Sequence, residues 1–123
     1  MYSLPQEIEV WYIIPALRKK LARGLVNSGL SMEKAGNILG ISKAAVSQYL
    51  SNKRANKIKF DSSFNREIGK SAKIIVGDNS CSVSEIQKLL REFKKTKQYC
   101  EICKKFNVGI TKFCKCNCNR CNC

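Results

Sequence analysis

Residues 31–50 read SMEKAGNILGISKAAVSQYL, and this stretch decides the fold of the first half of the chain. Ser31 and Ser42 each stand where a side-chain oxygen can cap the first turn of a helix. Gly40, between them, can take up the left-handed conformation that ends a helix, and small residues one turn earlier, Ala35 and Gly36, permit close helix approach. The stretch therefore predicts two short helices joined by a tight turn, a helix-turn-helix.

The second helix of this pair has side chains suited to reading DNA. Such a helix enters the major groove by its first turns. Gln48 can pair bidentately with adenine, Ala44 can touch a thymine methyl, and Ser47 can serve several base edges. Basic residues just past the helix are placed for phosphates, and so for affinity rather than specificity. The residues expected to contact DNA are Ser42, Lys43, Ala44, Ser47, Gln48, Lys53 and Arg54.

Helical spacing of apolar residues continues on both sides of the pair, and no stretch alternates as a strand does, so the chain is expected to be all-α. The expected helices run from Pro5 to a break or kink at Pro15, from there to Asn27, over 32–39, over 43–50, from an Asp61 cap to Gly77, and onward from Ser82. Ser82 and Glu85 form a predicted capping box. The apolar face of that last helix is expected to be Val83, Ile86, Leu89, Leu90 and Phe93, and Trp11 and Tyr12 are expected to be core or dimer-interface residues.

The composition narrows the range of functions. The 123 residues include 23 Lys+Arg, 9 Asp+Glu and no His, a net charge of +14 that favours nucleic acid or an anionic membrane face as partner. The longest apolar stretch, Val10–Leu17, is about half the length of a membrane span. With no signal-like start, the protein is expected to be cytoplasmic, without a membrane partner. Neither a glycine-rich phosphate loop nor a catalytic constellation is present, so no enzyme activity and no small-molecule substrate are expected.

Every cysteine except Cys81 falls in residues 100–123, a distribution typical of a metal site rather than a disulfide framework. The pair Cys100 and Cys103 can hold one metal or cluster from a single turn. All-thiolate ligation suits a [4Fe–4S] cluster and structural zinc alike, and redox-active thiols without metal are a third possibility. Residues 116–123 (CNCNRCNC) are of low complexity, although Cys118-x2-Cys121 is a second candidate pair. Cys81 is expected to be a small buried apolar residue.

Two segments carry a resemblance to a known family. LPQEIEVWYIIPALRKKLARGLV at 4–26 and SMEKAGNILGISKAAVSQYLSNKR at 31–54 resemble an archaeal family of predicted transcriptional regulators with an Xre/Cro-type helix-turn-helix. The resemblance implies sequence-specific binding to double-stranded DNA and a cysteine site of Cys100, Cys103 and Cys114, with Cys116 as the fourth ligand. Gly36 stands where the family usually has alanine, which is expected to loosen that helix by about 1 kcal/mol.

Together these observations predict three zones: a helix-turn-helix DNA-binding domain (1–58), a helical dimerisation and coupling region (59–99) and a cysteine-rich metal-binding segment (100–123). The leading hypothesis is a homodimeric transcriptional regulator whose iron–sulfur cluster senses redox state or metal. The alternatives are a regulator with structural zinc, a metal-buffering basic protein, and a protein that binds nucleic acid through charge alone.

Overall fold

Helices make up most of the computed structural model, which describes residues 5–55 and 58–106, and none of these residues lies in a strand. In chain order the elements are α1 (Pro5–Ile8), the π-helical segment η1 (Glu9–Ile13), α2 (Ile14–Asn27), α3 (Met32–Leu39), α4 (Lys43–Leu50), α5 (Ser62–Gly77), the 3₁₀ turn η2 (Asn79–Cys81), α6 (Ser82–Lys94) and α7 (Lys97–Phe106). The all-α prediction is confirmed for this part of the chain.

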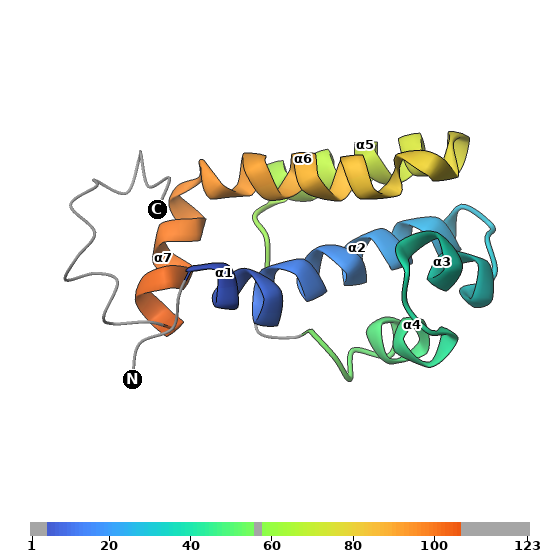
Figure 1. Cartoon of the computed structure of the whole chain (residues 1–123), viewed down its shortest axis with the longest axis horizontal. Coiled ribbons are helices and arrows are strands. Elements are labelled where there is room, and N and C mark those ends of the chain that lie inside the picture. Colours follow the sequence, from blue (N-terminus) through green and yellow to red (C-terminus); the bar gives the residue numbers. More distant parts are fainter. Residues whose placement is uncertain (1–4, 56–57, 107–123) are drawn as a thin grey trace.

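The helices are arranged around α2, which lies at the centre of the molecule (Figure 1). The antiparallel pair α5 and α6 forms a layer along one side of α2, and the shorter pair α3 and α4 lies at the C-terminal end of α2 on its other side. At the opposite end, α7 turns away from α6 and lies beside α1. One cluster of buried side chains joins residues of all three zones expected from the sequence, from Ile8 to Cys103.

The predicted helix starts at Ser31, Ser42 and Asp61 are confirmed by their hydrogen bonds. Ser31 Oγ accepts from the Lys34 amide at 3.1 Å, Ser42 Oγ from the Ala45 amide at 3.0 Å, and Asp61 Oδ1 from the Phe64 amide at 2.8 Å. Each side chain satisfies an amide that the first turn of a helix leaves without a partner.

The helices α2, α3 and α4 all end with the same backbone device. A residue at the C-cap or directly after it has a positive φ: 103° at Gly29, 73° at Gly40 and 60° at Asn52. In each case the next amide donates to a carbonyl five residues back, as in Leu30 to Leu25 (3.2 Å), Ile41 to Gly36 (2.9 Å) and Lys53 to Gln48 (2.9 Å). These Schellman-type ends reverse the chain direction locally, so short connections are enough to stack the three helices.

Gly36 is required by the turn between α3 and α4. A Cβ atom built at this position would lie 2.6 Å from the Ile41 carbonyl oxygen, so the backbone would have to move. The expected need for a small residue here is confirmed. The expectation that glycine merely loosens α3 relative to alanine is wrong in this context, because alanine would meet backbone rather than open space.

The prediction was a break or a kink at Pro15; the helix does not break there, but its α-helical winding is interrupted by the π-helical segment η1 just before the proline. α1, η1 and α2 follow one another without a gap, and the Ile14 amide donates to the Glu9 carbonyl, five residues back, just before the proline. Widening the helix by one residue accommodates Pro15 near the start of α2, where its missing amide does not interrupt a hydrogen bond. On this segment Trp11 is 54% exposed, which excludes it from the core.

The predicted capping box at the start of α6 is wrong. Ser82 is buried, and its side chain caps nothing; instead Asp78 Oδ1 accepts from the Ser80 amide at 3.0 Å and caps η2. Because η2 leads directly into α6, the backbone is already helical before Ser82, and the side-chain cap lies earlier in the chain, at Asp78. Val83, expected on the apolar face, is instead 69% exposed. Cys81 is only partly buried, and its thiol donates to Asp78 Oδ2 at 3.5 Å, a contact that raises the thiol pKa.

Helix α7 was not predicted, and it crosses the expected boundary between residues 99 and 100. Its first turn buries Tyr99 completely against the ring of Phe93, at a centroid distance of 6.2 Å. The Tyr99 hydroxyl donates to Glu9 Oε1 at 3.2 Å, and the Lys94 ammonium lies 2.9 Å from the same oxygen. Burial raises the pKa of Tyr99 well above its ordinary value, so the hydroxyl remains a donor. This buried contact connects η1, α6 and α7.

Candidate functional site

The helix α4 presents two chemically different faces. Ala45, Val46 and Tyr49 are buried against the other helices. The side chains between them face solvent, and all five residues of α4 and its cap that were expected to contact DNA are exposed: Ser42, Lys43, Ala44, Ser47 and Gln48. The structure thus brings these five together on one accessible surface, hereafter the α4 face. Gln48 and Ser47 project from it without any role in packing.

Of these residues, Ser42 also has a structural role. Its oxygen accepts the Ala45 amide as the helix cap, while its hydroxyl hydrogen remains available for donation. The Ser42 side chain therefore has two roles: it caps α4, and it provides a polar group at the edge of the α4 face.

The segment after α4 carries the two other residues expected at DNA, Lys53 and Arg54, and both are exposed. The Arg54 guanidinium lies over the Tyr49 ring, 5.8 Å from its centroid, a cation–π arrangement that orients it close to α4. Asn52 connects the segment to α2, because its Oδ1 accepts from Arg23 Nη2 at 2.7 Å. Residues 52–54 therefore contact α2 through Asn52 and α4 through Arg54.

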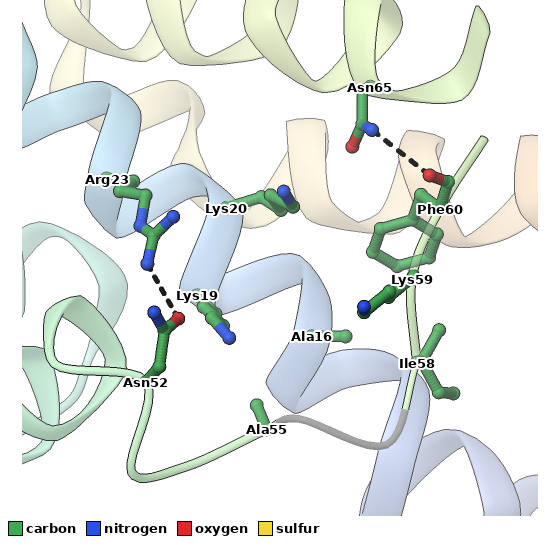
Figure 2. A pocket seen from close by; sticks show the side chains of 10 residues that line it. All are labelled: Ala16, Lys19, Lys20, Arg23, Asn52, Ala55, Ile58, Lys59, Phe60 and Asn65. Carbon is green, nitrogen blue, oxygen red and sulfur yellow. Dashed lines mark hydrogen bonds between the residues drawn. The ribbon is translucent and has the colours of Figure 1, made fainter. Parts of the chain in front are cut away.

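A pocket of about 610 Å³ lies between α2, the described residues 52–55 and 58–60, and the first turn of α5 (Figure 2). Its basic lining residues are Lys19, Lys20, Arg23 and Lys59. Partial burial lowers the pKa of Lys19, and the neighbouring positive charges lower it further. Sequence reasoning missed this pocket. The basic run at 18–20 was visible, but its proximity to Lys59 depends on how the chain returns after α4.

The expected metal ligands fall partly within the structure. Cys100 and Cys103 are buried one helical turn apart on α7, at 4% and 3% exposure, with Cys103 hydrogen-bonded to Tyr99. Cys114 and Cys116 lie outside the described residues. Within residues 5–55 and 58–106, no group of three or more Cys, Asp or Glu side chains could hold a metal ion. The structure thus contains two of the four expected thiol ligands.

Comparison of the chain with protein-family models, with curated proteins and with solved structures finds no match. Within the part of the chain that the structure describes, no helix has the length and apolar character needed to cross a membrane. The exposed large apolar residues of the described chain fall in two places, Val10 and Trp11 on η1, and Ile74, Val76 and Val83 near the connection between α5 and α6.

Proposed function

We propose that the protein is a sequence-specific DNA-binding transcriptional regulator. The observation that carries the proposal is the α4 face: a helix whose buried side packs on the domain and whose accessible side carries hydrogen-bonding groups suited to base edges. The chain's net charge of +14 supplies the attraction to a polyanion. The resemblance of residues 4–54 to Xre/Cro-type regulators agrees with this function.

In the proposed complex the first turns of α4 enter the major groove. Gln48 pairs with an adenine edge, Ala44 contacts a thymine methyl group, and Ser47 hydrogen-bonds a neighbouring base. Ser42 and Lys43, at the start of α4, contact the DNA backbone, and Lys53 and Arg54, which follow α4 in the chain, bind DNA phosphates. Sequence preference therefore depends on the middle of α4, and general affinity depends on its flanks.

The regulator is proposed to act as a homodimer that reads two half-sites about one helical turn, roughly 34 Å, apart. Apolar side chains of the expected coupling region that face solvent in the single chain support this: Ile74 and Val76 on α5, and Val83 on α6. A second copy would remove them from water, which is favourable in proportion to the apolar area covered.

The C-terminal cysteines are proposed to hold a [4Fe–4S] cluster, with zinc as the alternative. Cys100 and Cys103 fit this role as donors, since they are thiols on the same side of one helical turn and are shielded from water. With Cys114 and Cys116 they would complete four thiolates. A cluster would give the regulator a redox state that zinc does not have. Iron, acid-labile sulfide and zinc per chain, measured in protein purified without air, distinguish the two.

The DNA-binding proposal is tested with sequences selected from a random duplex library and then measured by gel shift. We expect Gln48→Ala to weaken binding to the selected sequence by about 1–3 kcal/mol while leaving random duplex unchanged. The matched control is Gln87→Ala, an exposed glutamine on α6. Arg54→Ala is expected to weaken both duplexes alike, with Arg66→Ala on α5 as its control.

Two outcomes would reject this function. The first is a selection that enriches no sequence, which is the behaviour expected of a protein that binds nucleic acid by charge alone. The second is equal affinity of Gln48→Ala and Gln87→Ala for the selected duplex. Several metal ions per chain together with no sequence preference would instead favour the metal-buffering alternative.

A further inference from the structure

The pocket between α2, α5 and the segment after α4 concentrates positive charge in a recess. Its four cationic side chains come from two separate parts of the chain, and none of the described residues that line it is acidic. Grouping like charges in a partly buried space is unfavourable by itself, as the lowered pKa of Lys19 shows. An anion in the pocket would remove this penalty.

The recess distinguishes these cations from those near the α4 face. Lys19, Lys20 and Arg23 are each half-buried and Lys59 is exposed at the rim, whereas all three basic residues beside α4 are exposed: Lys43, Lys53 and Arg54. Exposed side chains can reach out to the convex backbone of a duplex. The half-buried ones line an open hollow of about 610 Å³, a volume in the range typical of small-molecule sites.

Asn65 adds a neutral polar group to the pocket. Its Nδ2 donates to the Phe60 carbonyl at 3.1 Å, which fixes the orientation of the amide (Figure 2). Its Oδ1 is buried and accepts no hydrogen bond from any described residue. A buried acceptor of this kind is normally satisfied, and a hydroxyl group on a bound molecule would satisfy it.

The described backbone on either side of the pocket, residues 52–55 and 58–60, has specific conformations and contacts. Asn52 and Ala55, both lining residues, have φ of 60°, a conformation that non-glycine residues adopt rarely. Gln98 Nε2 of α7 donates to the Lys59 carbonyl. Ala16 and Ile58 supply an apolar part of the lining. The cations are thus presented by a positioned framework, next to an apolar surface that can accept the uncharged part of a ligand.

We propose that this pocket binds a small phosphorylated ligand that also carries hydroxyl groups, of the sugar phosphate or nucleotide class. The cations receive the phosphate oxygens through charge-assisted hydrogen bonds, and Asn65 Oδ1 receives a hydroxyl. The site does not depend on DNA binding by α4, and it is separate from the α4 face.

Calorimetric titration of the full chain with adenosine diphosphate tests the proposal at about 150 mM ionic strength, where weak surface attraction is screened. We expect one molecule bound per chain. The variant Lys20→Ala/Lys59→Ala should weaken binding by at least about tenfold, because it removes two of the charge-assisted contacts. The control Lys73→Ala/Arg91→Ala removes the same charge from exposed positions of α5 and α6 and should change affinity by less than about twofold.

Loss of folding does not account for the expected result. Lys20→Ala/Lys59→Ala relieves repulsion between like charges, so its thermal midpoint, measured by circular dichroism, should equal or exceed that of the wild type. Inorganic pyrophosphate, which has no hydroxyl bound to carbon, should bind more weakly than adenosine diphosphate. Equal affinity for the two would overturn the assignment of Asn65.

Absence of saturable binding, or equal weakening in the two double variants, would overturn the proposal. If adenosine diphosphate does not bind and Lys20→Ala/Lys59→Ala weakens random duplex more than the control does, the pocket receives a DNA phosphate instead. That result would leave the proposed function standing. Binding of adenosine diphosphate by a chain that recognises no DNA sequence would have the opposite meaning: the pocket proposal would be supported and the DNA-binding function rejected.

Discussion

The α3–α4 pair and the α5–α6 pair are both made of two helices with a short connection, but they are stabilised in different ways. Helices α3 and α4 have eight residues each, and half of their six buried residues are small: Ala35, Gly36 and Ala45. Helices α5 and α6 have 16 and 13 residues and bury larger ones, including Phe64 and Phe93. Short helices are marginal by themselves, so α3 and α4 depend on caps, a glycine contact and packing on α2.

This difference bears on function. The buried residues of α4, Ala45, Val46 and Tyr49, are different from the residues of the α4 face, so that face can carry polar groups. The longer pair commits large apolar side chains to the core. Substitutions on the α4 face are therefore expected to cost little stability, whereas substitutions at the buried positions of α5 and α6 are expected to cost more.

The largest effect is expected at Phe93, whose ring lies at centroid distances of 5.0 Å from Phe60 and 5.1 Å from Phe64. Phe93→Ala should lower the free energy of unfolding by about 3–5 kcal/mol, measured by urea denaturation. The neighbouring control Glu92→Ala should cost less than about 0.5 kcal/mol, since its ion pair with Lys95 is exposed. If Phe93→Ala does not fold, Phe93→Leu should cost about 1 kcal/mol. A small effect at Phe93 would remove the distinction between the two pairs.

A polar contact at the other end of the core tests whether the long pair relies on burial alone. Glu9→Ala leaves the buried Tyr99 hydroxyl without its acceptor and Lys94 without its carboxylate. We expect a loss of about 1–3 kcal/mol in unfolding free energy. Glu9→Gln retains an acceptor for Tyr99 and should lose less. Equal losses would show that the charge on Glu9, rather than its hydrogen bond, holds α7.

Glycine substitutions separate close approach from helix propensity. Gly36→Ala should destabilise the protein by about 1–2 kcal/mol, because the clash with the Ile41 carbonyl outweighs the gain in propensity. Gly69→Ala on α5 meets nothing within 4 Å and should stabilise by up to about 1 kcal/mol. Thermal midpoints of the two variants should therefore move in opposite directions. Stabilisation by both would mean that α3 and α4 approach less closely than described.

The smallest effect concerns the cap of α4. Ser42→Ala removes the acceptor of the Ala45 amide and should cost about 1 kcal/mol of unfolding free energy. Ser47→Ala, on the exposed α4 face, should stay within about 0.5 kcal/mol. Chemical denaturation of the two variants side by side would sharpen the contrast between structural and exposed residues of one helix. A larger loss at Ser47 would contradict the view that the α4 face is free of packing roles.

The places where sequence reasoning failed have a common cause. Ser82 and Glu85 have the spacing of a capping box, but the backbone is already helical in η2, before Ser82. The side chain that caps this helical stretch is therefore Asp78. Helix α7 was not predicted because the i, i+3 spacing of Cys100 and Cys103 is typical of a metal-binding pair. The same spacing is also that of two residues on the buried face of a helix. In both cases a local pattern did not reveal a helical turn that depends on tertiary packing; the burial of Cys100 and Cys103 on α7 leaves their proposed role as metal ligands untested.

The sequence by itself determined where the helices α2 to α5 end and which side of α4 faces solvent. Those features depend on caps, left-handed residues and apolar spacing, which act within a few residues. Only the tertiary structure decided that Glu9 meets Lys94 and Tyr99, and that Lys59 joins the basic residues of α2 around one pocket. Such contacts join residues far apart in the chain. Their geometry depends on how the helices pack, which no local pattern encodes.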